Sequence, residues 1–294
     1  MDAASRAYRI GIAALLVTSI GWAMNWPALK VLVREIPPLF ARGLSGVAAS
    51  ILLALVAIAL RQSLGVPRAE WGRLLRAAFT NVFVWMGFAT LAIRWLSAGQ
   101  GALLVYTMPA WATLFAWPVR GERPHLRAVI GLLTCFAGLL FMFGGQHVAV
   151  DRDHLVGAAL ALGSAIVFAF GTVAFRPPAL PSVTLVAWQV GLGCLPMIPL
   201  GWWMEPADLR DVSATGWALM AYMTLVPMGI CYLGWFAALR RLPASTAAIG
   251  TLLVPVIGVV ASAALLGEPF GGPEIAALVL TVGGVALVLF RPAA

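Results

Sequence analysis

The chain has 294 residues, 62% of them hydrophobic and only 10% charged, and its mean hydropathy is +0.96. Soluble globular domains carry about 25% charged residues, so this composition excludes a domain whose whole surface faces water. The formal net charge is +8, but the basic residues stand singly between apolar runs and form no stripe that could follow a nucleic-acid backbone. We therefore expect a lipid bilayer around the protein and no nucleic-acid partner.

Ten apolar segments follow one another along the chain, and each is long enough to cross a bilayer as an α-helix. We expect them at residues 8–29, 37–60, 72–93, 98–119, 126–145, 155–175, 182–203, 214–237, 244–265 and 272–290. Short breaks with turn residues, such as Pro37-Pro38 and Gly267-Glu268-Pro269, separate them. The runs are too long for strands and lack the alternation of a membrane β-barrel. The sequence therefore predicts an all-α integral membrane protein with ten transmembrane helices.

The positions of the basic residues predict the orientation, because arginine and lysine concentrate in cytoplasmic loops. With both termini in the cytoplasm, 13 of the 19 basic residues lie inside, against three of the 11 acidic residues. The inside set is Arg6, Arg9, Arg61, Arg68, Arg73, Arg76, Arg120, Arg123, Arg127, Arg176, Arg240, Arg241 and Arg291. Every basic residue except Lys30 is an arginine, a bias typical of GC-rich bacterial genomes. We expect cytoplasmic termini in a multi-pass protein of a bacterial inner membrane.

A shift of 146 residues aligns the two halves of the chain without a gap. It pairs Gly11 with Gly157, Trp71 with Trp217, Pro109 with Pro255, Gly121-Glu122 with Gly267-Glu268, and Gly138 with Gly284. We expect two five-helix units, residues 1–146 and 147–294, and the odd number of helices requires the second unit to insert in the opposite orientation. Such inverted repeats are typical of transporters, whose substrate site lies between the halves near the middle of the membrane.

The polar residues of the spans limit the chemistry. No Asp or Glu lies in the middle of a predicted span, which argues against a carboxylate proton relay and against a strongly cationic substrate. The histidines His125, His147 and His154 all fall in loops, and no spacing of His, Cys, Asp or Glu matches a metal site or a catalytic motif. We expect no metal and no cofactor, and an intramembrane enzyme remains a remote alternative.

Aromatic rings, two amides and mid-span prolines are the candidates for a substrate cavity, because rings offer apolar contact and a surface for an ammonium group. The candidates are Trp22, Asn25, Asn81, Trp85, Tyr106, Pro109, Trp111, Phe168, Tyr232, Trp235, Thr251 and Pro255. Thr251 is included because a proline frees the carbonyl four residues earlier in a helix. For every candidate the alternative is structural: packing, an interhelical hydrogen bond or an ordinary membrane-helix kink.

Five further groups have two interpretations. Pro227 also lies near the centre of a span, where a cavity-lining kink and an ordinary proline are equally supported. Glu122 and Glu268 follow equivalent helices; they either form alternating gate contacts or stabilise a helix end, and we favour the helix end. For Lys30 and Arg42, near the predicted outer face, we expect snorkelling to water.

Several residues of the first half occur in an order that resembles a known family, the EamA-type members of the drug/metabolite transporter superfamily, which also have ten spans. The residues that carry the resemblance are Trp22-x2-Asn25-x4-Lys30, Arg42, Pro109 and Gly121-Glu122. Within this superfamily the chain is most similar in general character to amino-acid and aromatic-metabolite exporters of the YddG type. The second half departs from the motif, with Phe168, Gly171 and Trp188 at the positions of Trp22, Asn25 and Arg42.

The resemblance implies a secondary transporter that exports small neutral or zwitterionic solutes by alternating access through a cavity between the repeats. Amino acids, including those with bulky apolar and aromatic side chains, are the expected substrates. A broad multidrug or metabolite exporter on the same fold is the alternative, and a channel or an intramembrane enzyme is a rival from another class. The sequence does not give the oligomeric state, and a monomer is compatible with it.

Overall fold

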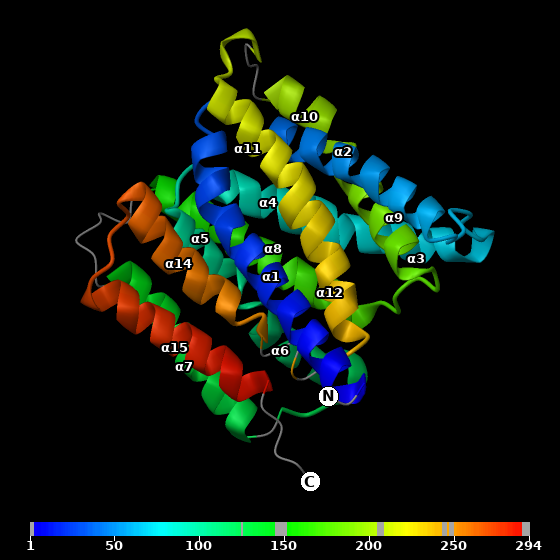
Figure 1. Cartoon of the computed structure of the whole chain (residues 1–294). Helices are drawn as coiled ribbons and strands as arrows, with labels where there is room; N and C mark the ends of the chain where they lie inside the picture. The colour runs from blue at the N-terminus through cyan, green and yellow to red at the C-terminus, as the bar shows by residue number, and fades with distance from the viewer. Residues whose placement is uncertain are drawn as a thin grey trace.

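The structure is a computed structural model that describes residues 3–124, 126–144, 152–204, 209–242, 246 and 250–289. Within these residues it contains helices and no strands (Figure 1). The first half comprises α1 (Ala3–Leu32), α2 (Pro38–Ala59), α3 (Trp71–Ala78), the π-helix η2 (Phe79–Val84), α4 (Trp85–Ala92), α5 (Ala98–Val105), α6 (Met108–Arg120) and α7 (Leu126–Gly144). The second half comprises α8 (Arg152–Ala174), α9 (Ser182–Cys194), α10 (Met197–Met204), α11 (Ala214–Leu225), the π-helix η4 (Val226–Ile230), α12 (Cys231–Leu239), α14 (Leu253–Leu266) and α15 (Gly272–Leu289).

Seven helical stretches of the described chain are long and apolar enough to cross a membrane, and three shorter apolar helices accompany them. The prediction of an all-α membrane protein with several spans is therefore confirmed. The count of ten spans and the inside–outside assignment stay predictions. The predicted boundary between residues 146 and 147, and most of the start of the span expected at 244–265, lie outside the described residues.

Large apolar side chains cover the outer surface. Leu126, Leu133 and Leu140 recur every seven residues on one face of α7, and each is at least 66% exposed. A water-soluble protein rarely exposes an apolar stripe of this kind. In a bilayer the same stripe lies against lipid, so these side chains contact hydrocarbon rather than water.

Three helices are interrupted where the sequence places prolines or polar residues. The π-helices η2 and η4 occupy equivalent positions under the 146-residue shift, although only η4 contains a proline, Pro227. The span expected at 98–119 is interrupted just before Pro109, because α5 ends at Val105 and α6 begins at Met108. The prediction of a free carbonyl at Thr251 is wrong: this carbonyl accepts a hydrogen bond from the N–H of Val254 at 3.0 Å, because a tight turn precedes α14.

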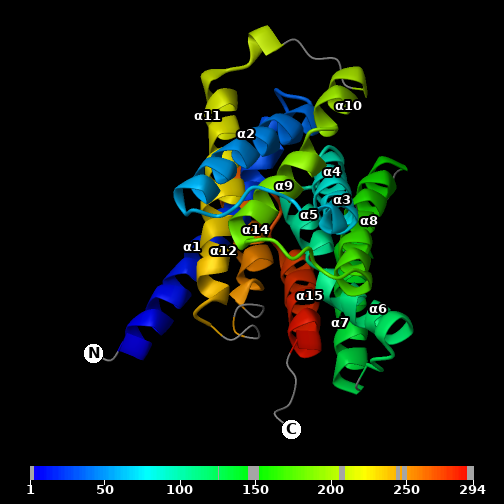
Figure 2. The same ribbon diagram turned by 90° about the vertical axis from the view of Figure 1, so that its right-hand side faces the viewer.

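The packing of the two halves is reciprocal. α7 packs against α15 and α2 against α9, and these pairs are equivalent helices of the two halves. α1 packs against α14 and α12, and its counterpart α8 packs against the matching helices α6 and α4. In both views the first turn of α1 and the last turn of α15 lie at the same end of the molecule (Figure 2).

Glycines show the same reciprocity in detail. A Cβ atom on Gly138 of α7 would lie 2.7 Å from the backbone nitrogen of Thr281, and one on Gly284 of α15 would lie 2.5 Å from that of Cys135. Thr281 and Cys135 are themselves 146 residues apart. Each helix thus needs its glycine at the crossing, because the backbones approach too closely for a side chain.

Candidate functional site

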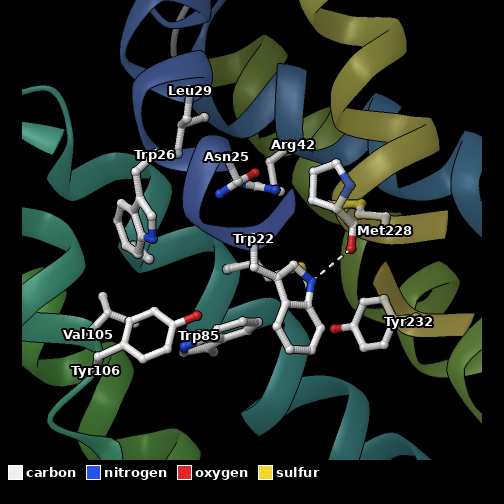
Figure 3. Close-up of a pocket in the computed structure, with 13 residues that line it drawn as sticks. Trp22, Asn25, Trp26, Leu29, Arg42, Trp85, Val105, Tyr106, Met228 and Tyr232 are labelled. Atoms are coloured by element: carbon white, nitrogen blue, oxygen red, sulfur yellow. Dashed lines mark hydrogen bonds between the residues drawn. The ribbon is translucent and has the colours of Figure 1, made fainter. Parts of the chain in front are cut away.

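A cavity of about 60 Å³ lies between α1, α2, α4, the end of α5, η4 and α12 (Figure 3). It is lined by Trp22, Asn25, Trp26, Leu29, Arg42, Trp85, Met86, Ala89, Val105, Tyr106, Pro227, Met228 and Tyr232. This volume holds a few water molecules and is smaller than the pockets of about 300–1,000 Å³ that enclose drug-sized ligands. A bulky solute therefore needs the walls to move apart.

Helix α1 supplies one wall by simple helical periodicity. Trp22, Asn25, Trp26 and Leu29 follow the i, i+3, i+4, i+7 pattern that places side chains on one face of a helix. The Trp22 ring is held by a hydrogen bond from its Nε1 to the carbonyl of Pro227 at 3.0 Å. This bond joins the first half of the chain to the irregular segment of the second half.

Arg42 of α2 lies in the cavity wall and is only 6% exposed. Its Nε donates a hydrogen bond to Oγ1 of Thr90, a fully buried residue of α4, at 2.9 Å. The prediction that Arg42 snorkels to water is therefore wrong. Buried residues recur every three to four positions along α2, and Arg42 is one of them. Its side chain therefore points into the helix bundle rather than along it.

The interruptions of the helices bring two further groups to the cavity. Tyr106 occupies the break between α5 and α6, where the chain leaves the helical path before Pro109. Pro227 and Met228 belong to the π-helix η4, whose wider turn displaces them from the regular helical position. Irregular helix segments at this depth are tolerated where they line a cavity.

Two polar atoms of the cavity residues have no hydrogen-bond partner although they are buried. They are the amide oxygen Oδ1 of Asn25 and the indole Nε1 of Trp85; among the described side chains the one other atom of this kind is Oγ1 of Thr281 in α15. Buried polar atoms are normally satisfied. One cavity thus holds an acceptor and a donor that lack hydrogen-bond partners, which indicates that a ligand or a water molecule bonds to them.

Aromatic rings form the rest of the wall. Trp22 meets Tyr232 edge-on at 5.7 Å between ring centroids and lies 5.9 Å from Trp235. Trp85 lies 5.3 Å from Phe168. In the view of Figure 3 the Asn25 amide and the Arg42 guanidinium lie above the rings of Trp22, Trp85, Tyr106 and Tyr232. In this view the two polar groups therefore lie to one side of these four rings.

The structure places five of the twelve predicted site residues in the cavity wall: Trp22, Asn25, Trp85, Tyr106 and Tyr232. Phe168 and Trp235 stand behind this wall as ring neighbours. Five other candidates do not line the cavity, namely Asn81, Pro109, Trp111, Thr251 and Pro255. Asn81 instead accepts a hydrogen bond from Thr80 at 2.9 Å, and Trp111 donates one to Thr107 at 3.1 Å.

Sequence reasoning passed over several residues of the wall. Trp26 and Leu29 follow from Trp22 by the helical spacing alone, so the periodicity of α1 could have identified them. Arg42 could have been found as a charge inside a span, since such charges are functional candidates by default. Met86, Ala89, Val105 and Met228 give no sequence signal that distinguishes them from other apolar residues. In the described part of the chain, no three His, Cys, Asp or Glu side chains are placed to hold a metal ion.

Comparison with known families covers most of the chain in two matches. The EamA-like transporter family matches residues 9–144 and, a second time, residues 155–290. The chain belongs to the EamA-like transporter family. It is a multi-pass transporter of the bacterial inner membrane, as the apolar helices and the bacterial relatives together show.

Relatives of this EamA protein are similar along nearly their full length. The "Uncharacterized transporter YvbV" of Bacillus subtilis is 30% identical over 92% of this chain and 88% of the relative. The "Probable amino-acid metabolite efflux pump" of Salmonella typhimurium is 28% identical over 95% and 94%, and the "Probable terminal-alkyne amino-acid exporter" of Streptantibioticus cattleyicolor is 27% identical over 94% and 92%. A crystal structure covering 97% of both chains, with a TM-score of 0.64 and 20% identity, has the same fold.

Proposed function

We propose that this EamA transporter exports amino acids and related zwitterionic solutes, including those with bulky apolar and aromatic side chains. The observation that carries the proposal is the composition of the cavity, which combines one buried cation, one unsatisfied amide oxygen and five aromatic side chains. An amino acid has the complementary groups, a carboxylate, an ammonium and an apolar side chain. The names of two relatives, a probable amino-acid metabolite efflux pump and a probable terminal-alkyne amino-acid exporter, support the same substrate class.

Transport proceeds, in this proposal, by alternating access between two inverted repeats, residues 1–146 and 147–294. The reciprocal helix packing, the equivalent π-helices and the paired glycines support a pseudo-two-fold relation. A cavity too small for a bulky solute also requires a second conformation with wider walls. Both termini then lie in the cytoplasm, and the ten spans form two sets of five.

The direct test is counterflow in liposomes that contain the purified protein. Liposomes loaded with unlabelled L-phenylalanine should take up labelled L-phenylalanine faster than liposomes loaded with buffer or with glucose. We expect this exchange without a pH gradient, because no carboxylate lines the cavity. Equal uptake under all loading conditions would exclude the proposed substrate, and uptake that rises without saturation would favour a channel.

A broad multidrug or metabolite exporter is the alternative, and the aromatic wall is the observation that favours it, because rings accept many apolar solutes. Competition separates the two functions. An amino-acid exporter loses counterflow to other amino acids and not to lipophilic cations, whereas a multidrug exporter loses it to both. Turnover of the solute during these assays would indicate an intramembrane enzyme.

The proposed topology is tested by cysteine labelling from outside intact cells. Single cysteines at Glu122 and Arg240 should be protected from a membrane-impermeant reagent, and a cysteine at Trp203, which is 80% exposed, should react. The reverse pattern would invert the orientation, and labelling of all three positions would exclude the inverted-repeat arrangement.

A further inference from the structure

The buried Arg42 carries a charge that no acidic side chain of the described residues neutralises, since no described carboxylate forms an ion pair with it. The side-chain partner of Arg42 among these residues is the neutral hydroxyl of Thr90, which accepts a hydrogen bond from Nε. Burying an unpaired charge is expensive, and charged residues inside membrane spans are rare and functional for that reason.

The terminal Nη groups of the Arg42 guanidinium remain available to bind a ligand. The bond to Thr90 occupies Nε and leaves the two terminal Nη groups without a side-chain partner among the described residues, at the end of a side chain that lines the cavity. A guanidinium binds a carboxylate through two parallel N–H groups, an arrangement that gives both energy and direction. The ligand that fits this end of the cavity is therefore an anion with planar, paired oxygens.

The unsatisfied amide oxygen of Asn25 and the aromatic rings indicate which other groups the ligand carries. Oδ1 of Asn25 is a buried acceptor without a donor, and it lies on the same polar side of the cavity as Arg42 in Figure 3. An ammonium group is a donor only. The rings of Trp22, Trp85 and Tyr232 then surround the remaining, apolar part of the solute.

We propose that Arg42 binds the carboxylate of the transported solute and that Asn25 receives its ammonium group, so that these two residues determine the specificity for α-amino acids. This assignment rests on the proposed function, because it places the substrate in this cavity. Thr90 is a positioning residue, which acts by orienting Arg42. The second half of the chain contributes apolar and aromatic surface but neither polar contact.

A ligand series tests the assignment on the unaltered protein. The series is L-phenylalanine, L-phenylalaninamide, which lacks the carboxylate, and 3-phenylpropionate, which lacks the ammonium. Binding is measured by quenching of tryptophan fluorescence in detergent. Because hydrogen bonds to charged groups are the strong ones, we expect the amide to bind roughly 10- to 100-fold more weakly than phenylalanine. The propionate should retain carboxylate binding and lose about tenfold through the missing ammonium.

Variants then assign the effect to Arg42. In Arg42→Gln, phenylalanine and its amide should bind equally weakly, and 3-phenylpropionate should lose binding as well. Arg42→Lys keeps the positive charge but lacks the two parallel N–H groups of the guanidinium. It should therefore restore part of the preference for phenylalanine over its amide. Thr90→Ala keeps Arg42 and frees its orientation, so the preference for phenylalanine over the amide should shrink severalfold. The matched control is Arg68→Gln, which removes an exposed arginine and should change none of these ratios.

The outcomes separate this inference from the proposed function. Binding of phenylalanine and phenylpropionate that depends on Arg42, without counterflow, would refute amino-acid export and support the carboxylate site. Counterflow of phenylalanine and of its amide at equal rates, unaltered in Arg42→Gln, would support export and overturn the site. Equal weakening of all three ligands by Arg42→Gln would mean that Arg42 is structural and would also overturn it. If Arg42→Gln does not fold, the ligand series and Thr90→Ala decide alone.

Discussion

The two halves of the chain share their backbone features but not the chemistry of their side chains. Under the 146-residue shift the glycines of the helix crossings, the π-helices and the left-handed glycines Gly121 and Gly267 all recur. The polar cavity residues do not: Asn25 and Arg42 correspond to Gly171 and Trp188. Helix geometry is shared by both halves, while the two residues proposed to bind the polar groups of the solute, Asn25 and Arg42, lie in the first.

Trp188 shows what the second half does with the equivalent position. Its Nε1 donates a hydrogen bond to the carbonyl of Leu64 at 3.0 Å, and its ring meets Trp71 edge-on at 5.6 Å. Both partners belong to the connection and helix that follow α2. The residue equivalent to Arg42 therefore ties the two halves together instead of lining the cavity.

The carboxylates that follow the left-handed glycines differ in the same way. Glu268 accepts hydrogen bonds from the first two N–H groups of α5, at Ala98 (2.7 Å) and Gly99 (3.0 Å). These bonds stabilise the start of α5, as the helix-end interpretation expects, and the choice between this role and a gate contact stays a prediction. Glu122, the counterpart of Glu268, is exposed. The turn at Gly267-Glu268 thus connects the two halves at the end predicted to face outside. The equivalent turn at Gly121-Glu122 is exposed.

The largest expected effect tests the shared geometry at the α7–α15 crossing. Gly138→Ala and Gly284→Ala should each lower the free energy of unfolding by about 1–3 kcal/mol, because the added Cβ meets backbone atoms that cannot move aside. Thermal unfolding in detergent measures this. The control is Gly283→Ala, where nothing lies within 4 Å of the new atom and stability should hold or rise. A large effect at only one of the two crossing glycines would break the equivalence of the halves.

The next effect tests the unequal carboxylates. Glu268→Ala should cost about 2 kcal/mol of stability, because two charge-assisted hydrogen bonds to the start of α5 are lost. Glu122→Ala should stay within about 0.5 kcal/mol, as is usual for an exposed side chain. The same unfolding measurement applies to both variants. Similar losses for the two would indicate that both turns make their contacts equally in the purified protein.

A third effect tests the two deep amides of the first half. Asn25→Ala should weaken phenylalanine binding about tenfold and leave stability unchanged, because Oδ1 of Asn25 has no partner to lose. Asn81→Ala is the control, since Asn81 bonds to Thr80 and lies outside the cavity wall. Binding is measured by fluorescence quenching. If Asn81→Ala weakens binding more than Asn25→Ala, the recognition surface has been misplaced.

The smallest effect concerns backbone strain alone. Gly121 and Gly267 have φ angles of 73° and 66°, and a Cβ atom at either would meet nothing within 4 Å. Alanine at each should therefore cost about 1 kcal/mol, the strain of a left-handed non-glycine residue, and the two costs should be equal. Unequal unfolding midpoints for the two variants would show that the turns are held by different surroundings.

The sequence by itself determined the features that are local or periodic. Long apolar runs specify membrane helices because each backbone polar group must be satisfied within its own segment. The Gly-Glu pairs mark helix ends because glycine takes the left-handed conformation without strain. The break before Pro109 follows from the missing N–H of proline. Five cavity residues were predicted because they are aromatic or amide side chains deep in an apolar span.

Tertiary structure decided which face of each helix meets the cavity. Asn25 and Asn81 are both deep amides, but only Asn25 lies in the wall, whereas Asn81 bonds to its neighbour Thr80. Trp111 was a candidate equal to Trp22, yet it packs against Phe136 and bonds within its own helix. The direction of Arg42 depends on Thr90, 48 residues away in the chain. The contacts of Arg42 with Thr90 and of Trp111 with Phe136 arise where helices distant in sequence cross, so no local pattern contains them.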